Sequence, residues 1–122
     1  VAAVKWLPKG QNIGYGDMYR TRRPTRIAVI PVGHFDGWGM AGVRDSFRLR
    51  DHLRYIKEDF RRIGRDNRLF VEIGGCKAPL LGRMTMSNAI ADVTDIPCCT
   101  GDIVTIHTSP TGISPAVARM YI

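Results

Sequence analysis

Residues 69–81, "LFVEIGGCKAPLL", are typical of two short strands joined by a tight turn. The runs "LFVEI" (69–73) and "CKAPLL" (76–81) are short and largely apolar. Gly74–Gly75 lies between them, and a two-residue hairpin turn favours such a pair because its central residues take positive φ angles. The stretch therefore predicts an antiparallel hairpin.

Further runs of the same kind occur along the chain. Gly, Pro, Asp or Ser separates them, and "GD" at 101–102 predicts another turn that leads into a strand. Many short strands with frequent turns favour an antiparallel β-barrel or a β-sandwich, so the predicted fold class is mainly β. The further runs are "RIAVIPV" (26–32), "AIADVTD" (89–95), "DIVTIH" (102–107) and "VARMYI" (117–122).

The segment "SFRLRDHLRYIKEDFRRIG" (46–64) instead predicts one amphipathic helix. Its apolar residues recur at intervals of three and four, with Ser46 suited to its start and Gly64 to its end. Its arginines fall on the opposite face, which we interpret as the solvated side of a helix packed over the β-domain. Nucleic acid or a protein partner on that face are the alternatives, and five acidic residues between 44 and 68 argue against nucleic acid. The apolar residues are Leu49, Leu53, Ile56, Phe60 and Ile63.

The length of 122 residues predicts a single domain, 1–122, and 44% hydrophobic with 24% charged residues is ordinary for a globular protein. No apolar run approaches the roughly 20 residues that span a bilayer, and the start "VAAVKWLPKG" lacks a signal-peptide pattern. Since the chain begins with Val1 rather than Met, we expect it to be a piece of a longer protein. The net charge of +7 keeps open the hypothesis of a small basic β-barrel that binds nucleic acid.

The cysteines and histidines do not predict a disulfide framework or a metal site. Cys76, Cys98 and Cys99 are odd in number and include an adjacent pair, which favours a reduced, cytoplasmic setting. The three histidines, at positions 34, 52 and 107, show no ligand spacing. We therefore expect no bound metal.

Tyr15 stands between Gly14 and Gly16, a setting that leaves a phenol bare and lets other backbone come close. The phenol either packs against the turn or takes part in chemistry. The following Asp17 does not fit the glycine-rich pattern of a phosphate-binding loop. Tyr15 is therefore the first candidate for a functional side chain.

Several blocks, read together, resemble the C-terminal β-domain of alanine racemase. "VKWLPKGQNIGYGDMYRTRRPTRIAVIPVGHFDGW" (4–38) resembles the opening blocks of that family, with its GYG tyrosine and "RPTRIA" strand. "KAPLLGRMTMSNAIADVTDIP" (77–97) resembles a later block, and the "GD" turn and the final "VARMYI" follow in the family's order. The resemblance covers nearly the whole chain except the segment after Gly39.

The resemblance implies a C-terminal antiparallel β-barrel or Greek-key-like domain, with the helix at about 46–64 as an insertion. In this family the cofactor is pyridoxal 5'-phosphate, which a lysine of a preceding (β/α)8 barrel holds. Such a barrel takes about 250 residues, so this chain would lack it and be inactive alone. The implied partners are an N-terminal barrel domain, the other subunit of a homodimer and a small amino-acid substrate, with neither nucleic acid nor a membrane.

The resemblance also implies roles for particular residues. Tyr15 would enter the active site of the partner subunit as one of two groups that move the α-proton. The backbone of Met86 would contact the substrate carboxylate, and His34 and Arg83 would line the substrate entrance. Other interpretations stay open: a packed turn aromatic for Tyr15, a core methionine for Met86 and a surface arginine for Arg83. The arginines within 20–26 would help a phenolate to form, although strand alternation would turn most of them away.

The chain departs from the family pattern at several positions. His34 stands where the family has a tyrosine, and Ser87, followed by Asn88, replaces an aspartate. No residue matches the family's phosphate-binding tyrosine, since Tyr121 lies in the last predicted strand. The implied substrate is alanine or serine, and D-alanine would serve peptidoglycan synthesis in a bacterial cytoplasm. The alternative hypothesis is a non-catalytic dimerisation or regulatory module derived from such a domain.

Overall fold

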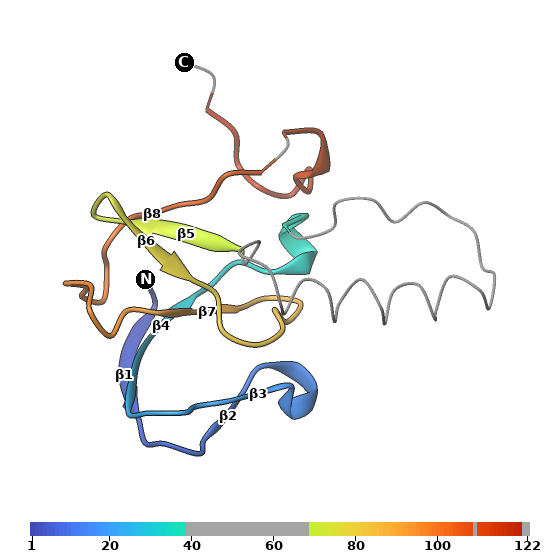
Figure 1. The fold of residues 1–122 in the computed structure, drawn as a ribbon. Helices are drawn as coiled ribbons and strands as arrows, with labels where there is room; N and C mark the ends of the chain where they lie inside the picture. The colour runs from blue at the N-terminus through green and yellow to red at the C-terminus, as the bar shows by residue number, and fades with distance from the viewer. Residues whose placement is uncertain (39–68, 109, 121–122) are drawn as a thin grey trace, which may run out of the picture.

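The computed structural model describes residues 1–38, 69–108 and 110–120 (Figure 1). Short strands dominate these residues, and tight turns and three short 3-10 helices connect them. The predicted helix at 46–64 lies outside the described residues. The elements are β1 (Ala3–Leu7), β2 (Asn12–Ile13), η1 (Tyr15–Asp17), β3 (Tyr19–Arg20), β4 (Thr25–Ile30), η2 (His34–Asp36), β5 (Phe70–Ile73), β6 (Cys76–Pro79), β7 (Ala89–Asp92), β8 (Val104–Thr105) and η3 (Pro110–Gly112).

Strand β4 is the centre of the first sheet, with β1 and β7 antiparallel on either side. Ile27 faces a small apolar cluster with Ile13 of β2 and Leu81, whereas Ala28 and Ile30 belong to the larger core on the opposite face. Figure 1 shows this layering, with β5 and β6 on one side of the first sheet and the β2–β3 ribbon on the other. Because both faces of this sheet are covered, apolar residues follow one another along β4 instead of alternating with polar residues.

The second sheet has the order β6-β5-β8, and its hairpin is the one that the sequence predicts. Ile73 pairs with Cys76 across the turn, and Gly74 and Gly75 have φ angles of 56° and 79°. Two successive positive φ angles match the right-handed twist of the paired strands. The predicted hairpin is therefore confirmed, and the other predicted strands at 26–32, 89–95 and 102–107 overlap β4, β7 and β8.

The two sheets meet where the chain leaves β6. Leu80 forms a bridge with Ala91 of β7, and the N–H of Leu81 donates to the carbonyl of Ile90 at 2.8 Å. Small side chains lie in this region, which lets the backbones approach closely. Fully buried alanines and branched residues make up most of the core between the sheets: Ala28, Ile30, Val71, Ile73, Ala78, Ala89, Ala91 and Val93.

The mainly β class is confirmed, but the described strands form two sheets and a ribbon rather than a closed barrel. Edge strands β1 and β8 each pair on one side only among the described residues. A two-residue β8 is too short to close a barrel. The predicted last strand at 117–122 is wrong for its described part, since Val117 donates to the carbonyl of Ser114 in a turn and residues 117–120 form no strand.

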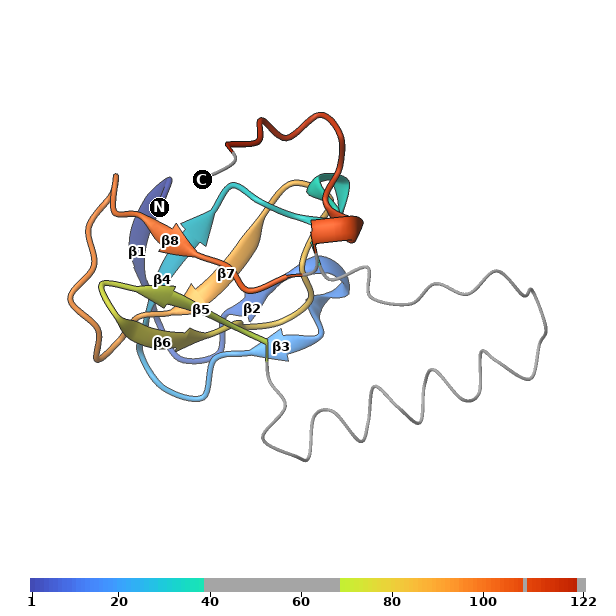
Figure 2. The same ribbon diagram turned by 90° about the horizontal axis from the view of Figure 1, so that it is seen from above.

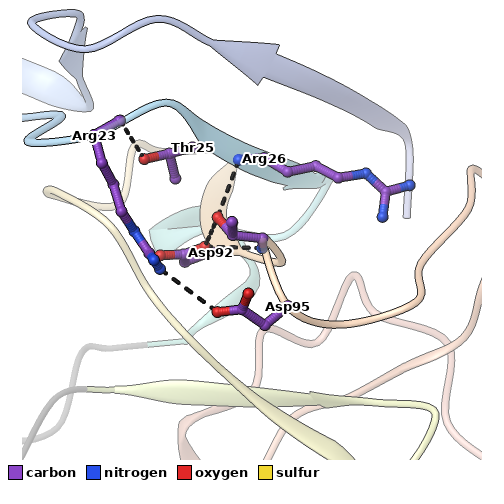
Figure 3. Close-up of polar contacts among 6 residues, drawn as sticks. Arg23, Thr25, Arg26, Asp92 and Asp95 are labelled. Carbon is purple, nitrogen blue, oxygen red and sulfur yellow. Dashed lines mark hydrogen bonds and ion pairs between the residues drawn. The ribbon is translucent and has the colours of Figure 1, made fainter.

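The "DVTD" sequence after β7 is tied to β4 by side chains (Figure 3). The Asp92 carboxylate accepts hydrogen bonds from the N–H and the hydroxyl of Thr94, at 2.9 and 2.6 Å. The Thr94 hydroxyl oxygen in turn accepts the N–H of Arg26 at 3.1 Å. Arg23 pairs with Asp95 at 3.6 Å, an exposed contact that contributes little stability. The network fixes the turn at the end of β7 in place.

Candidate functional site

We call residues 82–88 the bridging segment. Their backbone carbonyls accept hydrogen bonds from two separate turns, η1 and η2. The N–H of Tyr15 in η1 donates to the carbonyl of Arg83 at 3.4 Å. The N–H of His34 in η2 donates to the carbonyl of Thr85 at 3.1 Å, and that of Phe35 to the carbonyl of Met86 at 2.8 Å. The structure thus brings together all four residues that the sequence analysis singles out.

Glycines make the contact with η1 possible. Gly14 and Gly82 have φ angles of 84° and 68°, which side-chain-bearing residues rarely adopt. A Cβ at Gly14 would lie 2.7 Å from the backbone nitrogen of Arg83, and one at Gly82 would lie 2.6 Å from the carbonyl oxygen of Ile13. No side chain fits between these backbones. The backbone next to Tyr15 is therefore fixed in position.

The Tyr15 side chain is 69% exposed, so it does not pack against the turn. The interpretation as a packed turn aromatic is therefore wrong for this chain. The phenol is free to reach a group outside the described residues. Its role as an acid or base stays a prediction.

His34 is fixed through both its backbone and its ring. Its Nδ1 lies 3.0 Å from the carbonyl oxygen of buried Trp38, and since a carbonyl only accepts, Nδ1 carries the proton. The turn itself closes through Asp36, whose carboxylate accepts the Gly33 N–H at 2.9 Å.

The far side of η2 packs against the C-terminal part of the chain. The N–H of Ser114 donates to the carbonyl of Asp36 at 2.9 Å. Gly37, with a φ of 89°, lies against the backbone of Gly112 in η3, and Figure 2 shows η2 and η3 side by side. Contacts on both sides therefore hold His34 in place.

Met86 and Met84 have opposite environments. Met84 is 9% exposed and belongs to the core, whereas Met86 is 62% exposed. The interpretation of Met86 as a core methionine is therefore wrong, and Met84 takes that place. The Met86 carbonyl is bound to Phe35, and its N–H donates to no group among the described residues.

The arginines after Tyr15 are mostly engaged elsewhere. Arg20 donates to the carbonyl of Gly10 at 2.8 Å, and Arg26 donates to that of Cys98 at 2.6 Å. The expectation that most of this run turns away from Tyr15 agrees with these contacts. Arg83, which is exposed and follows directly on the Gly14–Gly82 contact, is the basic residue next to the Tyr15 backbone.

The described residues do not supply a lysine for a covalently held cofactor at this site. Lys5, Lys9 and Lys77 lie outside the bridging segment, η1 and η2, and Lys77 lies 4.7 Å from the Phe70 ring centroid in the second sheet. Within residues 1–38, 69–108 and 110–120, no three His, Cys, Asp or Glu side chains gather as a metal site would require. In the same ranges, no helix is long and apolar enough to pass through a membrane.

Fold and site together define an antiparallel β-domain that presents its candidate functional residues on two turns and a bridging segment. The family model "Alanine racemase, C-terminal domain" matches residues 1–120. The chain therefore belongs to the alanine racemase family and represents its C-terminal domain.

Individual proteins agree with this assignment. Alanine racemase of Desulfosudis oleivorans is 34% identical over 113 residues, which cover 92% of this chain and 23% of that protein. A broad specificity amino-acid racemase of Pseudomonas taetrolens is 33% identical over 97 residues, or 80% of this chain and 18% of that protein. The solved alanine racemase from Bartonella henselae, with covalently bound pyridoxal phosphate, has a TM-score of 0.60 and 27% identity, covering 87% of this chain and 24% of that one.

The chain thus spans a quarter or less of the length of the curated relatives it matches.

Sequence reasoning found Tyr15, His34, Arg83 and Met86 through the family resemblance. It missed Thr85, which contacts η2 and closes the turn that carries Met86. The signal for it is a threonine three residues before an asparagine, a spacing at which the hydroxyl can bond to nearby backbone.

Proposed function

We propose that this chain is the C-terminal domain of a pyridoxal-phosphate-dependent racemase of small amino acids, alanine or serine. It supplies Tyr15 to the active site of the partner subunit in a homodimer. The observation that carries this proposal is an exposed phenol whose backbone is fixed by the Gly14–Gly82 contact and the hydrogen bond to Arg83. A fixed backbone below a free side chain suits a group that must meet a reacting atom outside its own domain.

Racemisation removes the α-proton from one face of the α-carbon and returns a proton to the other. Two groups must therefore face each other across the substrate, and Tyr15 is the one that this chain provides. The cofactor, when bound, spreads the negative charge that proton removal leaves on the substrate. Positive charge near the phenol would favour its role as a base. Arg83 is the basic residue whose backbone carbonyl accepts the Tyr15 N–H.

The other site residues handle the substrate before and during this step. The Met86 N–H meets the substrate carboxylate, and His34 and Arg83 line the entrance. An N-terminal barrel domain holds the cofactor, in keeping with the match of this chain to the C-terminal domain of the family. A racemase of this kind would make D-alanine for peptidoglycan in a bacterial cytoplasm.

The test uses the full-length protein reconstituted with pyridoxal phosphate and α-deuterated L- and D-alanine and serine. We expect Tyr15→Phe to abolish deuteron loss from one enantiomer while the other retains exchange. Tyr19→Phe is the matched control, because Tyr19 is a half-buried phenol in β3 and exchange should persist. Absence of exchange in the unmodified protein with all four substrates would overturn the proposal.

A second candidate is a non-catalytic dimerisation or regulatory module. The exposed apolar side chains on the two turns and the bridging segment favour it, since such side chains are common at protein interfaces. This candidate predicts that Tyr15→Phe leaves any activity of the full-length protein unchanged. The apolar side chains are Tyr15, Met18, Phe35 and Met86.

A further inference from the structure

The hydroxyl of Thr85 closes a four-residue turn in the bridging segment. It donates to the carbonyl of Asn88 at 3.1 Å, and its oxygen accepts the N–H groups of Asn88 and Ser87 at 3.0 and 3.4 Å. The backbone N–H of Thr85 also donates to the Asn88 carbonyl, at 2.9 Å. One donor and two acceptor sites are all that a hydroxyl offers, so this one is fully used.

These bonds leave one N–H of the turn without a partner among the described residues, that of Met86. The peptide that carries it begins at the carbonyl of Thr85, and this carbonyl accepts the N–H of His34. In a trans peptide, N–H and C=O point in opposite directions. The Met86 N–H therefore points away from the His34 backbone, and the carbonyl on its other side is held by Phe35.

The bridging segment itself suits an anion, and the Asp36 carboxylate of the adjoining η2 turn accepts the Gly33 N–H. Met86, Ser87 and Asn88 are all exposed, and the bridging segment 82–88 contains an arginine and no acidic residue. Ser87 stays neutral and accepts a hydrogen bond from the Asn88 side chain at 3.2 Å. A carboxylate would find a fixed donor and no repelling charge within this segment, and hydrogen bonds to ionised groups are the stronger ones.

We propose that Thr85 is a positioning residue that holds the Met86 N–H in the orientation that binds the substrate carboxylate. This inference rests on the proposed function and deepens it, because it assigns the binding of the carboxylate to a turn that one hydroxyl maintains. Thr85 acts through the backbone of Met86 and does not itself take part in proton transfer.

The test compares Thr85→Val, which keeps the shape but loses the hydroxyl, with Thr85→Ser, which keeps the hydroxyl. In the full-length protein with cofactor, Thr85→Val should raise KM for alanine and the inhibition constant of propionate by roughly 3- to 10-fold, the effect of losing one or two hydrogen bonds. The value of kcat should stay within about twofold of the unmodified protein. In Thr85→Ser, KM for alanine and the inhibition constant of propionate should both equal those of the unmodified protein. Amide hydrogen exchange at Ser87 and Asn88 should rise in Thr85→Val alone.

Thr25→Val is the matched structural control, because the buried Thr25 hydroxyl donates to the carbonyl of Arg23 at 2.8 Å, outside the bridging segment. It should lower stability without changing KM. Unchanged KM and propionate inhibition in Thr85→Val, or equal damage in Thr85→Ser, would overturn the inference while the proposed function stands. If the unmodified protein exchanges no α-proton, the proposed function fails, and the inference then stands or falls on whether saturating propionate slows exchange of the Met86 amide in a Thr85-dependent way.

Discussion

Gly14 and Gly82 lie with their backbones in direct contact, at the point where η1 meets the bridging segment. A Cβ at Gly82 would lie 2.6 Å from the carbonyl oxygen of Ile13, and the φ of 68° at Gly82 already disfavours a side chain. We expect Gly82→Ala to lower the free energy of unfolding by about 3 kcal/mol or more, since steric overlap adds to backbone strain. Urea denaturation followed by circular dichroism measures this loss.

Gly74→Ala is the matched control for that substitution. Gly74 also has a positive φ, 56°, but a Cβ there would meet no atom within 4 Å. The expected loss is about 1 kcal/mol, the cost of the left-handed conformation alone. Equal losses in the two variants would mean that the Gly14–Gly82 contact is not tight in solution.

The two methionines of the bridging segment should respond differently to truncation. Met84→Ala opens a cavity in the core and should cost about 2–5 kcal/mol of unfolding free energy. Met86→Ala removes an exposed side chain and should change it by no more than about 0.5 kcal/mol. Comparable losses would show that Met86 is buried in the folded protein.

The Thr94 hydroxyl should contribute more to the free energy of unfolding than an exposed threonine hydroxyl does. Thr94→Val leaves the N–H of Arg26 and the Asp92 carboxylate without the partner they share, which should cost about 1–3 kcal/mol. Thr105→Val on the exposed face of β8 is the control, with an expected change within about 0.5 kcal/mol. If thermal unfolding shifts equally in both variants, the network of Figure 3 does not stabilise the fold.

The three free cysteines should differ in reactivity. Burial, followed by the nearby charge of Asp102, raises the pKa of the Cys98 thiol, whereas Cys76 and Cys99 are exposed. Iodoacetamide at pH 8 should therefore modify Cys76 and Cys99 well before Cys98, because the thiolate is the reacting form. Peptide mass spectrometry at successive times reports the order, and early labelling of Cys98 would contradict its burial.

The raised pKa of the Cys98 thiol also predicts how the stability of the fold depends on pH. The fold keeps the Cys98 thiol neutral, so ionisation in the unfolded state begins at a lower pH than in the folded state. The stability that the neutral Cys98 thiol contributes is complete below the pKa that this thiol has in the unfolded state. It is lost as the pH rises through the higher pKa of the thiol in the folded state. Cys98→Ala should therefore show a smaller loss of stability than the unmodified protein between neutral pH and pH of about 10, measured by urea denaturation.

The sequence by itself determined the elements whose causes are local. The Gly74–Gly75 turn needs two positive φ angles, and the β-branched run in β4 needs cover on both faces, so neighbouring residues suffice to predict the hairpin and the strand. The family resemblance, carried by short motifs in a fixed order, pointed to Tyr15, His34, Arg83 and Met86. It could not say that Tyr15 stands free of its own turn.

Tertiary structure decided what depends on contacts between distant residues. Met84 and Met86 are two positions apart, and a strand would place them on one face, but the turn that Thr85 closes puts one in the core and the other in solvent. The mutual fit of Gly14 and Gly82, and the failure of the described strands to close a barrel, likewise depend on which backbones meet across the fold. Local propensity carries no information about such pairings, because they form only when the whole chain packs.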